Sequence, residues 1–196
     1  MILSTPPIVI LASTSHYRAG LLRRLIERFE QASPGTEEDH REGEAPATRA
    51  ARLAEAKARA VAAQRPGTVV IGSDQVADLD GTVLDKPGTV HAAHRQLAAS
   101  SGHDVVFHTA VCVIDVQGDA LVHVDETRVT FRPLSLADIE RYVERERPLD
   151  CAGSFKCEGL GIALFDRIVN EDPTALVGLP LIATSRLLRK AGIELP

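Results

Sequence analysis

An almost unbroken apolar run, T-V-V-I-G-S at Thr68–Ser73, is the feature that most restricts how this chain folds. It follows Pro66-Gly67, and its length favours a strand over a helix. A strand without polar alternation has both of its faces covered, as in sheets flanked by helices. A second short apolar strand, Ile8–Ala12, leads into a helical pattern over about Ser15–Phe29. Together these segments predict a sheet with helices packed against it.

The rest of the chain continues to mix helical and strand patterns. Pro46 marks the first turn of a helix over about Ala47–Gln64, which follows an acidic loop at Ser33–Ala45. Further patterns predict helices at about Val90–Ala99, Leu134–Arg147 and Pro180–Ala191, a hairpin of Val105–Ile114 with Ala120–Phe131, and a strand at Ile162–Val169. Ser135, with Asp138 three residues further on, resembles a capping box at the start of the second of these helices. We expect an α/β (mixed α+β) fold, in which a curved mixed sheet is flanked by helices and two lobes enclose a central cleft. Residues 1–196 are expected to form this single domain.

Composition narrows the classes of partner. The formal charge is −5 and the pI about 5.8, which argues against sequence-independent binding of nucleic acid, since that requires a basic face. Three cysteines, Cys112, Cys151 and Cys157, form no CxxC pair and indicate a reducing, cytosolic compartment. The apolar N-terminus is interrupted by Pro6-Pro7 and is too short to span a bilayer. These features favour a small-molecule ligand, and they leave a homodimer open.

The junction between the first strand and its helix carries hydroxyl side chains, in Ser13-Thr14-Ser15. Backbone N–H groups at such a junction bind phosphate, and Arg18, one turn further on, adds forked donors suited to phosphate oxygens. A simpler interpretation is that one hydroxyl only caps the helix.

Acidic residues occur at two places of interest. Asp74 directly follows the buried run, where a carboxylate is costly to desolvate unless it meets a metal, a cation or a catalytic task. Glu37 and Glu38 resemble an ordinary solvated acidic loop and gain significance only if the fold brings them beside Asp74. Two neighbouring carboxylates together with a triphosphate are a common way to hold Mg²⁺.

Three lysines, Lys57, Lys86 and Lys156, stand in apolar or glycine-containing segments rather than in runs of charge. Lysines that converge from distant segments neutralise a polyphosphate and so assist attack by water at phosphorus. Each lysine taken alone is equally well explained as a surface residue with a buried stem.

A loop at Phe155–Gly159 offers the carboxylate of Glu158, which suits the two adjacent donors on the edge of guanine. Gln75 supplies an amide, and Tyr17 supplies a flat ring on which a base, particularly a cationic methylated purine, would stack. A tyrosine early in a helix also has the ordinary alternative of core packing.

Several common motifs are absent from the sequence. There is no P-loop pattern, and Gly159-Leu160-Gly161 lacks the third glycine and the preceding strand of a dinucleotide-binding fingerprint. His91 and His94 lie one helical turn apart, but a solvent-facing pair is a simpler interpretation than a metal site.

Taken together, the motifs resemble the Maf-like nucleoside triphosphate pyrophosphatases. The matching segments are L-A-S-T-S-x-Y-R-x-x-L-L at 11–22, R-L-A-x-x-K-A at 52–58, I-G-S-D-Q at 71–75, K-P at 86–87, C-A-G-S-F-K-x-E-G-x-G-I at 151–162 and L-V-G-L-P-L at 176–181. The first, third and fifth are similar to the subgroup that hydrolyses 7-methyl-GTP to 7-methyl-GMP and pyrophosphate. The resemblance implies a cytoplasmic hydrolase that uses Mg²⁺ or Mn²⁺.

The resemblance also assigns roles to residues. It implies that Asp74 is the general base and that Tyr17, Gln75 and Glu158 select the nucleotide. Contacts to phosphate and metal fall to Ser13, Arg18, Glu38, Lys57, Lys86 and Lys156, with Glu38 and Asp74 holding the metal and with Glu38, Lys57 and Lys86 joining Asp74 in catalysis.

Three positions depart from the family pattern. His16 stands where proline is common, Glu37-Glu38 replaces an Asp-Glu pair, and Asp85 stands where glycine is common. Asp85 is expected to place an anion beside Lys86 and so to weaken phosphate binding or shift the metal.

Two alternative functions remain. The same cleft would serve a non-catalytic module that senses a nucleotide or regulates cell division through a protein partner. An RNA-end binder that uses Tyr17 as a stacking platform is disfavoured by the negative net charge.

Overall fold

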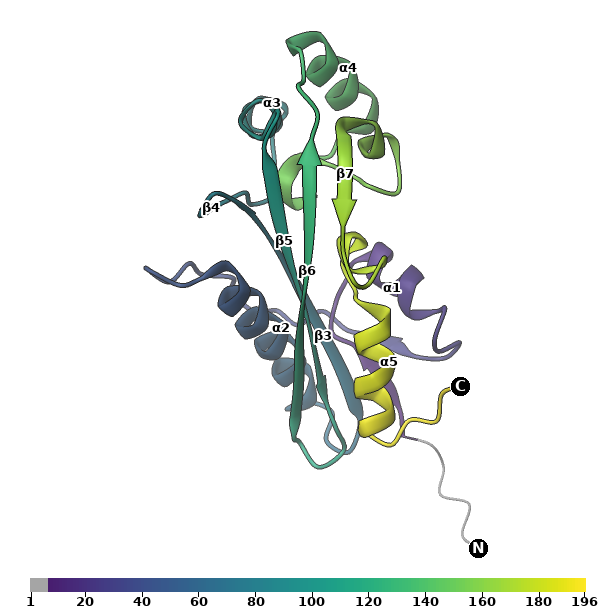
Figure 1. The fold of residues 1–196 in the computed structure, drawn as a ribbon. Helices are drawn as coiled ribbons and strands as arrows, with labels where there is room; N and C mark the ends of the chain where they lie inside the picture. Colours follow the sequence, from purple (N-terminus) through teal and green to yellow (C-terminus); the bar gives the residue numbers. More distant parts are fainter. Residues whose placement is uncertain (1–6) are drawn as a thin grey trace, which may run out of the picture.

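The computed structural model describes residues 7–196, which form a mixed sheet of seven strands flanked by helices (Figure 1). The strands are β1 (Val9–Leu11), β2 (Glu30–Gln31), β3 (Val69–Leu79), β4 (Thr82–Val83), β5 (Asp104–Ile114), β6 (Ala120–Phe131) and β7 (Phe165–Val169). The α-helices are α1 (His16–Leu22), α2 (Pro46–Ala62), α3 (Val90–Ser100), α4 (Leu136–Glu146) and α5 (Leu181–Lys190). The predicted α/β class with a mixed sheet is therefore confirmed. Interpretations that involve residues up to Pro6 lie outside the described residues.

The order of the strands is β2-β1-β3-β5-β6-β7, with β4 added beside β3. β1 pairs in parallel with β2 and β3, whereas β3, β5, β6 and β7 pair antiparallel. The predicted hairpin is confirmed as β5 and β6, which pair along their whole length. The sheet thus joins a parallel half to an antiparallel half at β3.

On one face of the sheet, α2 packs against β3 at Gly72. A Cβ atom on Gly72 would lie 2.2 Å from the carbonyl oxygen of Ala54 and 2.7 Å from the amide nitrogen of Ala58. Only glycine allows this separation between helix and strand. Small residues on α2, among them Ala50, Ala54 and Ala58, are fully buried against the strands. This close packing fixes the height at which longer side chains of α2 project over β3.

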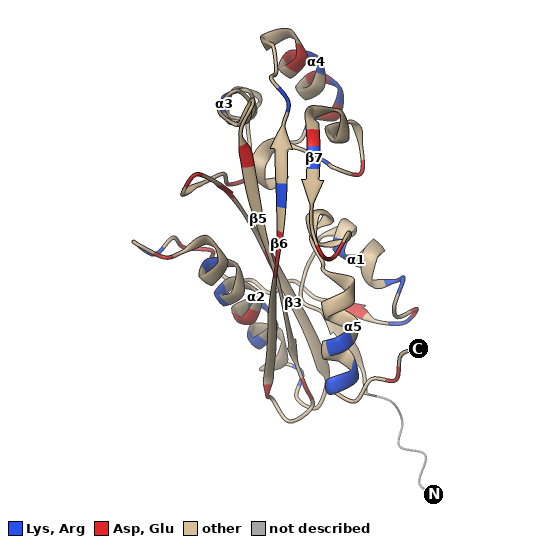
Figure 2. Cartoon of the chain, in the orientation of Figure 1, with Lys and Arg blue, Asp and Glu red and all other residues tan. Residues whose placement is uncertain are grey.

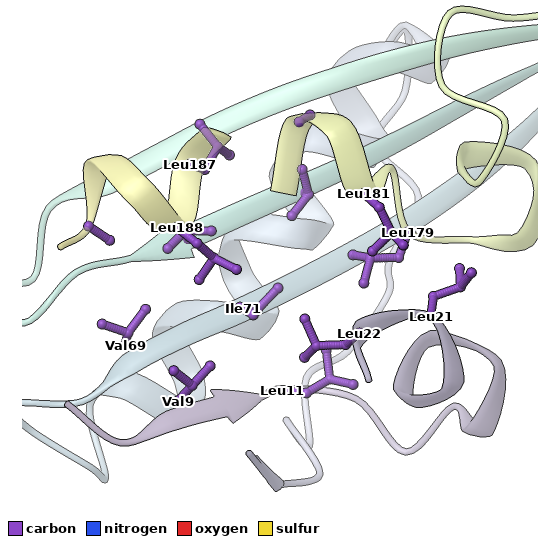
Figure 3. Packing of buried hydrophobic residues seen from close by; sticks show 14 of the residues in the cluster. Val9, Leu11, Leu21, Leu22, Val69, Ile71, Leu179, Leu181, Leu187 and Leu188 are labelled. Carbon is purple, nitrogen blue, oxygen red and sulfur yellow. The ribbon is translucent and has the colours of Figure 1, made fainter. Parts of the chain in front are cut away.

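The opposite face of the parallel half is covered by α1 and α5. Figure 3 shows aliphatic side chains from the strands and from both helices packed in one layer. Its labelled members are Val9, Leu11, Leu21, Leu22, Val69, Ile71, Leu179, Leu181, Leu187 and Leu188.

A second core covers the antiparallel half beneath α3 and α4. Phe155 packs edge-on against Phe107, Phe131 and Phe165, with ring centroids 5.1, 6.0 and 4.8 Å away. Such edge-to-face contacts fix ring positions as well as burying apolar area. Phe155 therefore anchors the loop that carries the next residues, 156–158.

Several predicted boundaries are wrong. The first helix ends at Leu22 rather than near Phe29, because the chain turns at residues 23–25 and returns to pair β2 with β1. The predicted strand at 162–169 begins at Phe165, since residues 160–164 form a 3₁₀ helix. The predicted capping box at Ser135 and Asp138 is present.

The central strand β3 is longer than its apolar run. It continues to Leu79, so Asp74 lies within the strand rather than after it. β1 pairs only with Val69–Ile71, and β4 pairs only with Asp78 and Leu79. Between these pairings, the residues of β3 from 72 to 77 have no strand partner on that edge within the described chain. Asp74 and Gln75 lie in this stretch of β3.

Surface properties agree with the composition. In Figure 2, acidic and basic residues both occur along α2, and residues of both signs are scattered over other parts of the described chain. No helix among residues 7–196 is long and apolar enough to cross a membrane. Cys112, Cys151 and Cys157 are all free thiols.

Candidate active site

A cleft of about 580 Å³ opens at the unpartnered edge of β3. Its volume lies within the range of roughly 300–1,000 Å³ that small-molecule sites occupy. The walls come from the β1–α1 junction, from α2 with the loop before it, from β3, and from the loop after α4. Every predicted site residue lines this cleft: Ser13, Tyr17, Arg18, Glu38, Lys57, Asp74, Gln75, Lys86, Lys156 and Glu158.

Lys57 joins the two predicted acidic residues at the centre of the cleft. Its Nζ lies 2.6 Å from Oδ1 of Asp74 and 2.6 Å from Oε1 of Glu38. Lys57 and Asp74 are buried, whereas Glu38 reaches in from an exposed loop. A buried ammonium and carboxylate offset each other's desolvation only when they pair at this range. In the sequence, the acidic loop that carries Glu38 resembles ordinary solvated surface. In the fold, Glu38 and Asp74 contact the same lysine, Lys57.

The surroundings shift the pKa values of Asp74 and Glu38 in opposite directions. Burial raises the pKa of Asp74, although the charges of Lys57 and Arg18 act against it. Burial also acts on Glu38, but the hydrogen bond from Lys57 and the charges of Lys57, Lys86 and Arg18 outweigh it and lower its pKa. A pair separated in this way is typical of sites in which one acid accepts a proton and the other remains an anion.

The β1–α1 junction is held in place by its own hydroxyl groups and by Gly178. Ser15 caps α1, and the Ser13 hydroxyl accepts a hydrogen bond from the amide of Ser15 at 3.1 Å. The Arg18 Nε donates to the carbonyl oxygen of Gly178 at 2.9 Å, and the Ser73 hydroxyl donates to the same oxygen at 2.9 Å. Arg18 is thereby fixed at the cleft beside Asp74 and Glu38.

The residues predicted to select a base also line the cleft. The Nε2 of Gln75 donates to the carbonyl oxygens of Ala175 and Leu176, both at 3.1 Å, so its amide orientation is set by the protein. Oε2 of Glu158 accepts a hydrogen bond from the Cys157 thiol at 3.3 Å. An amide fixed through its donor end presents an acceptor to a ligand, and a carboxylate presents two.

Tyr17 and Lys156 line the cleft as well. The Tyr17 ring is half-buried and tilted against His16 at a centroid distance of 3.8 Å. Burial raises the pKa of Tyr17, so the phenol stays protonated at neutral pH. Lys156 lies 3.7 Å from Asp150 and donates to the carbonyl oxygen of Glu146 at 3.3 Å.

Sequence reasoning missed several of the side chains that line the cleft. Among them are His40, Arg49 and Leu53. Arg49, Leu53 and Lys57 follow one another at intervals of four on α2 and so share a face. That spacing is visible in the sequence and marks Arg49 as a neighbour of whatever Lys57 contacts.

The residues present fit a divalent cation that is completed by its ligand. Lys57 contacts one oxygen of Asp74 and one of Glu38, which leaves each carboxylate its second oxygen. No group of three or more acidic, histidine or cysteine side chains able to hold a metal occurs within residues 7–196. Two carboxylates plus phosphate oxygens and water are the usual ligands of Mg²⁺ at nucleotide sites.

Comparison with known proteins agrees with the fold and the motifs. A family model described as "Maf-like protein" matches residues 8–191. The chain belongs to the Maf-like family. The match includes every residue of the cleft named above.

This Maf-like protein has curated relatives along nearly its full length. A 7-methyl-GTP pyrophosphatase from Xanthomonas oryzae pv. oryzae is 58% identical over 97% of this chain and 100% of the relative. A protein of the same name from Aromatoleum aromaticum is 54% identical over 96% of this chain and 97% of the relative. A solved nucleoside-triphosphatase (dITP/XTP pyrophosphatase) from Mycobacterium abscessus aligns with 64% of this chain and 74% of its own, at 17% identity and a TM-score of 0.41.

Proposed function

We propose that this protein is a nucleoside triphosphate pyrophosphatase that hydrolyses 7-methyl-GTP to 7-methyl-GMP and pyrophosphate. The observation that carries the proposal is the contact of Lys57 with both Asp74 and Glu38 inside a cleft that also holds Arg18 and Lys86. Relatives that are 52–58% identical over almost the whole chain bear the name of that activity. The free thiols fit a cytosolic enzyme.

In this proposal, Asp74 accepts a proton from the attacking water. Its burial raises its pKa and makes it a better base than an ordinary carboxylate. The water oxygen forms a bond to the α-phosphorus, and the bond from that phosphorus to the α,β-bridging oxygen breaks. The electron pair leaves with pyrophosphate, whose growing charge Arg18, Lys57 and Lys86 offset.

Glu38 and Asp74 would hold Mg²⁺ or Mn²⁺ through the oxygens that Lys57 does not contact. When bound, the metal supplies Lewis-acid polarisation of the phosphates and a lowered pKa for coordinated water. The lowered pKa of Glu38 keeps it ionised for that role at neutral pH. Ser13 and the amides of the β1–α1 junction bind phosphate oxygens.

Base selection is assigned to Glu158, Gln75 and Tyr17. The carboxylate of Glu158 and the amide oxygen of Gln75 are acceptors, which match the N1–H and amino donors of guanine. The Tyr17 ring and the negative charge of Glu158 both favour the cationic ring of a 7-methylated purine. Lys156, from the same loop as Glu158, contacts the phosphate side.

The test is a turnover screen. Purified protein with Mg²⁺ or Mn²⁺ is incubated with methylated and unmethylated nucleoside triphosphates, and pyrophosphate and monophosphate are quantified. We expect pyrophosphate release to be fastest with 7-methyl-GTP. Release from none of the nucleotides would refute the proposal, and calorimetry showing stable binding of intact nucleotide in the presence of metal would point to the sensing module instead.

A further inference from the structure

Three side chains that belong to separate segments form a closed ring of polar contacts at the rim of the cleft. The Nη1 of Arg49 lies 3.1 Å from Nδ1 of His40, and its Nη2 donates to Oδ1 of Asp85 at 3.2 Å. The Nε2 of His40 lies 3.1 Å from Oδ2 of Asp85. Each of the three residues thus contacts both of the others.

The donors and acceptors of the ring are mutually consistent. A guanidinium only donates, so Nδ1 of His40 accepts from Arg49 and Nε2 carries the ring proton. Nε2 of His40 faces Oδ2 of Asp85, whose Oδ1 accepts the hydrogen bond from Arg49. The side chain of Arg49 is 7% exposed, and its Nε has no partner within residues 7–196. The partners of this buried guanidinium in the described chain are therefore His40 and Asp85.

Each member of the ring lies close in sequence to a residue of the proposed catalytic centre. His40 is two positions after Glu38, and Asp85 immediately precedes Lys86. Arg49 lies two helical turns before Lys57 on the same face of α2. The ring therefore ties the loop that carries Glu38 and the segment that carries Lys86 to the one helix that carries Lys57.

The ring also explains why an acid is tolerated beside Lys86. The sequence led us to expect that Asp85 would counteract that lysine, but its carboxylate is directed to Arg49 and His40. Without Arg49, the same carboxylate would stand uncompensated at the rim of a cleft proposed to bind a polyphosphate, where like charges repel.

We propose that Arg49 is a positioning residue, which acts through His40 and Asp85 to hold the Glu38 loop and the Lys86 segment at the distance that a metal-bound triphosphate requires. The proposal rests on the proposed function. It adds residues that touch neither water nor the reacting phosphorus.

The test is a double-mutant cycle of Arg49→Gln and Asp85→Asn, with the exposed His40→Ala as the variant least able to disturb folding. We expect each single variant to raise KM for the nucleotide about 10-fold while kcat stays within about 3-fold. The double variant should also show about a 10-fold rise, because the ring acts as a unit. Arg49→Lys should recover only part of the loss, since one ammonium cannot replace the two-armed fork.

The matched control is Arg59→Gln on the same helix. Arg59 is exposed and, within residues 7–196, forms its ion pair only with Glu55, four residues away, so its loss should leave both kinetic constants unchanged. A rise of about 100-fold in the double variant, or unchanged KM in all three ring variants, would overturn the positioning role.

Hydrogen exchange of the protein without nucleotide provides a readout that does not depend on hydrolysis. The amides of residues 35–44 and 84–88 should exchange about 10-fold faster in Arg49→Gln and in His40→Ala, whereas the turn between β5 and β6 should not change. Unchanged exchange in both segments refutes the ring as a positioning device. Accelerated exchange in a protein that hydrolyses no nucleotide would instead refute only the proposed function.

Discussion

Two carboxylates lie buried on strands of the same sheet, Asp74 on β3 and Asp125 on β6. Burial raises the pKa of both, that of Asp125 to about 6. Asp74 faces Lys57 at 2.6 Å, with Arg18 nearby. By contrast, Oδ1 of Asp125 has no hydrogen-bond partner within residues 7–196.

The cavities beside the two acids differ in the same way. Asp125 lines a second cavity of about 400 Å³, and the acids Glu171 and Asp172 add their negative charge to its surroundings. The cleft at Asp74 gathers cations from α1, α2 and the segment after β4. The convergence of cations around Asp74, rather than its raised pKa alone, is what suits the cleft to an anionic substrate.

Replacing Asp74 by Asn should have the largest effect. Loss of the proposed base should lower kcat/KM about 1,000-fold, since general-base catalysis contributes roughly 10²–10⁴-fold. The matched variant Asp125→Asn should retain activity within about 2-fold, and pyrophosphate release measures both. Equal activities of the two variants would erase the distinction between the two acids.

Gly72→Ala should test whether the close packing of α2 on β3 places Lys57 against Asp74, a cation contact that Asp125 lacks within the described chain. The added Cβ meets the backbone of Ala54 at 2.2 Å, so α2 must move away from β3 and carry Lys57 from Asp74. We expect a loss of about 3 kcal/mol in the free energy of unfolding, at the upper end for overpacking. Gly20→Ala, with no atom within 4 Å of its Cβ, is the control and should be neutral or slightly stabilising in urea unfolding. A fully stable Gly72→Ala would mean that this contact does not set the position of α2.

Glu158→Gln should show whether the carboxylate of Glu158 recognises the nucleobase or takes part in catalysis. Glu158 is exposed on the loop anchored by Phe155, so its replacement should leave stability unchanged. The preference for 7-methyl-GTP over an adenine nucleotide should fall about 10-fold, or roughly 1.4 kcal/mol, with kcat little changed. A loss of kcat with intact preference would move Glu158 from recognition to catalysis.

The sequence predicted those elements that depend on local pattern. The hairpin of β5 and β6, the helix opened by Pro46 and the cap at Ser135 are confirmed because turn residues, proline and capping act within a few positions. The two-residue strand β2 was missed, since only its pairing with β1 defines it.

In the candidate site, too, the sequence predicted only what local patterns and motifs record. Motif resemblance identified residues that the fold brings into one cleft, but the apolar pattern placed Asp74 at the end of a strand that in fact continues to Leu79. Polar residues at 74 and 75 ended the apolar pattern, and they are tolerated because Asp74 pairs with Lys57 and Gln75 donates to backbone carbonyl oxygens. The contact of Arg49 with Asp85 spans 36 positions, and no local pattern records it.

The smallest effect concerns the stability of Asp125→Asn. The folded pKa of Asp125, about 6, is above the ordinary value, so the native state binds more protons than the unfolded state between about pH 4 and 6, and stability falls as pH rises through that window. Above about pH 6, Asp125 of the wild type is charged, and the folded protein bears the full desolvation cost of that buried carboxylate. We therefore expect Asp125→Asn to raise the free energy of unfolding at about pH 8 by about 1 kcal/mol, after allowance for screening by solvent in the adjoining cavity. Urea unfolding of the variant and the wild type measures this difference. The advantage should vanish near pH 4, where the wild-type acid is protonated. A stability difference that does not vary with pH would show that Asp125 is as well compensated as Asp74, and the contrast between the two acids would then fail.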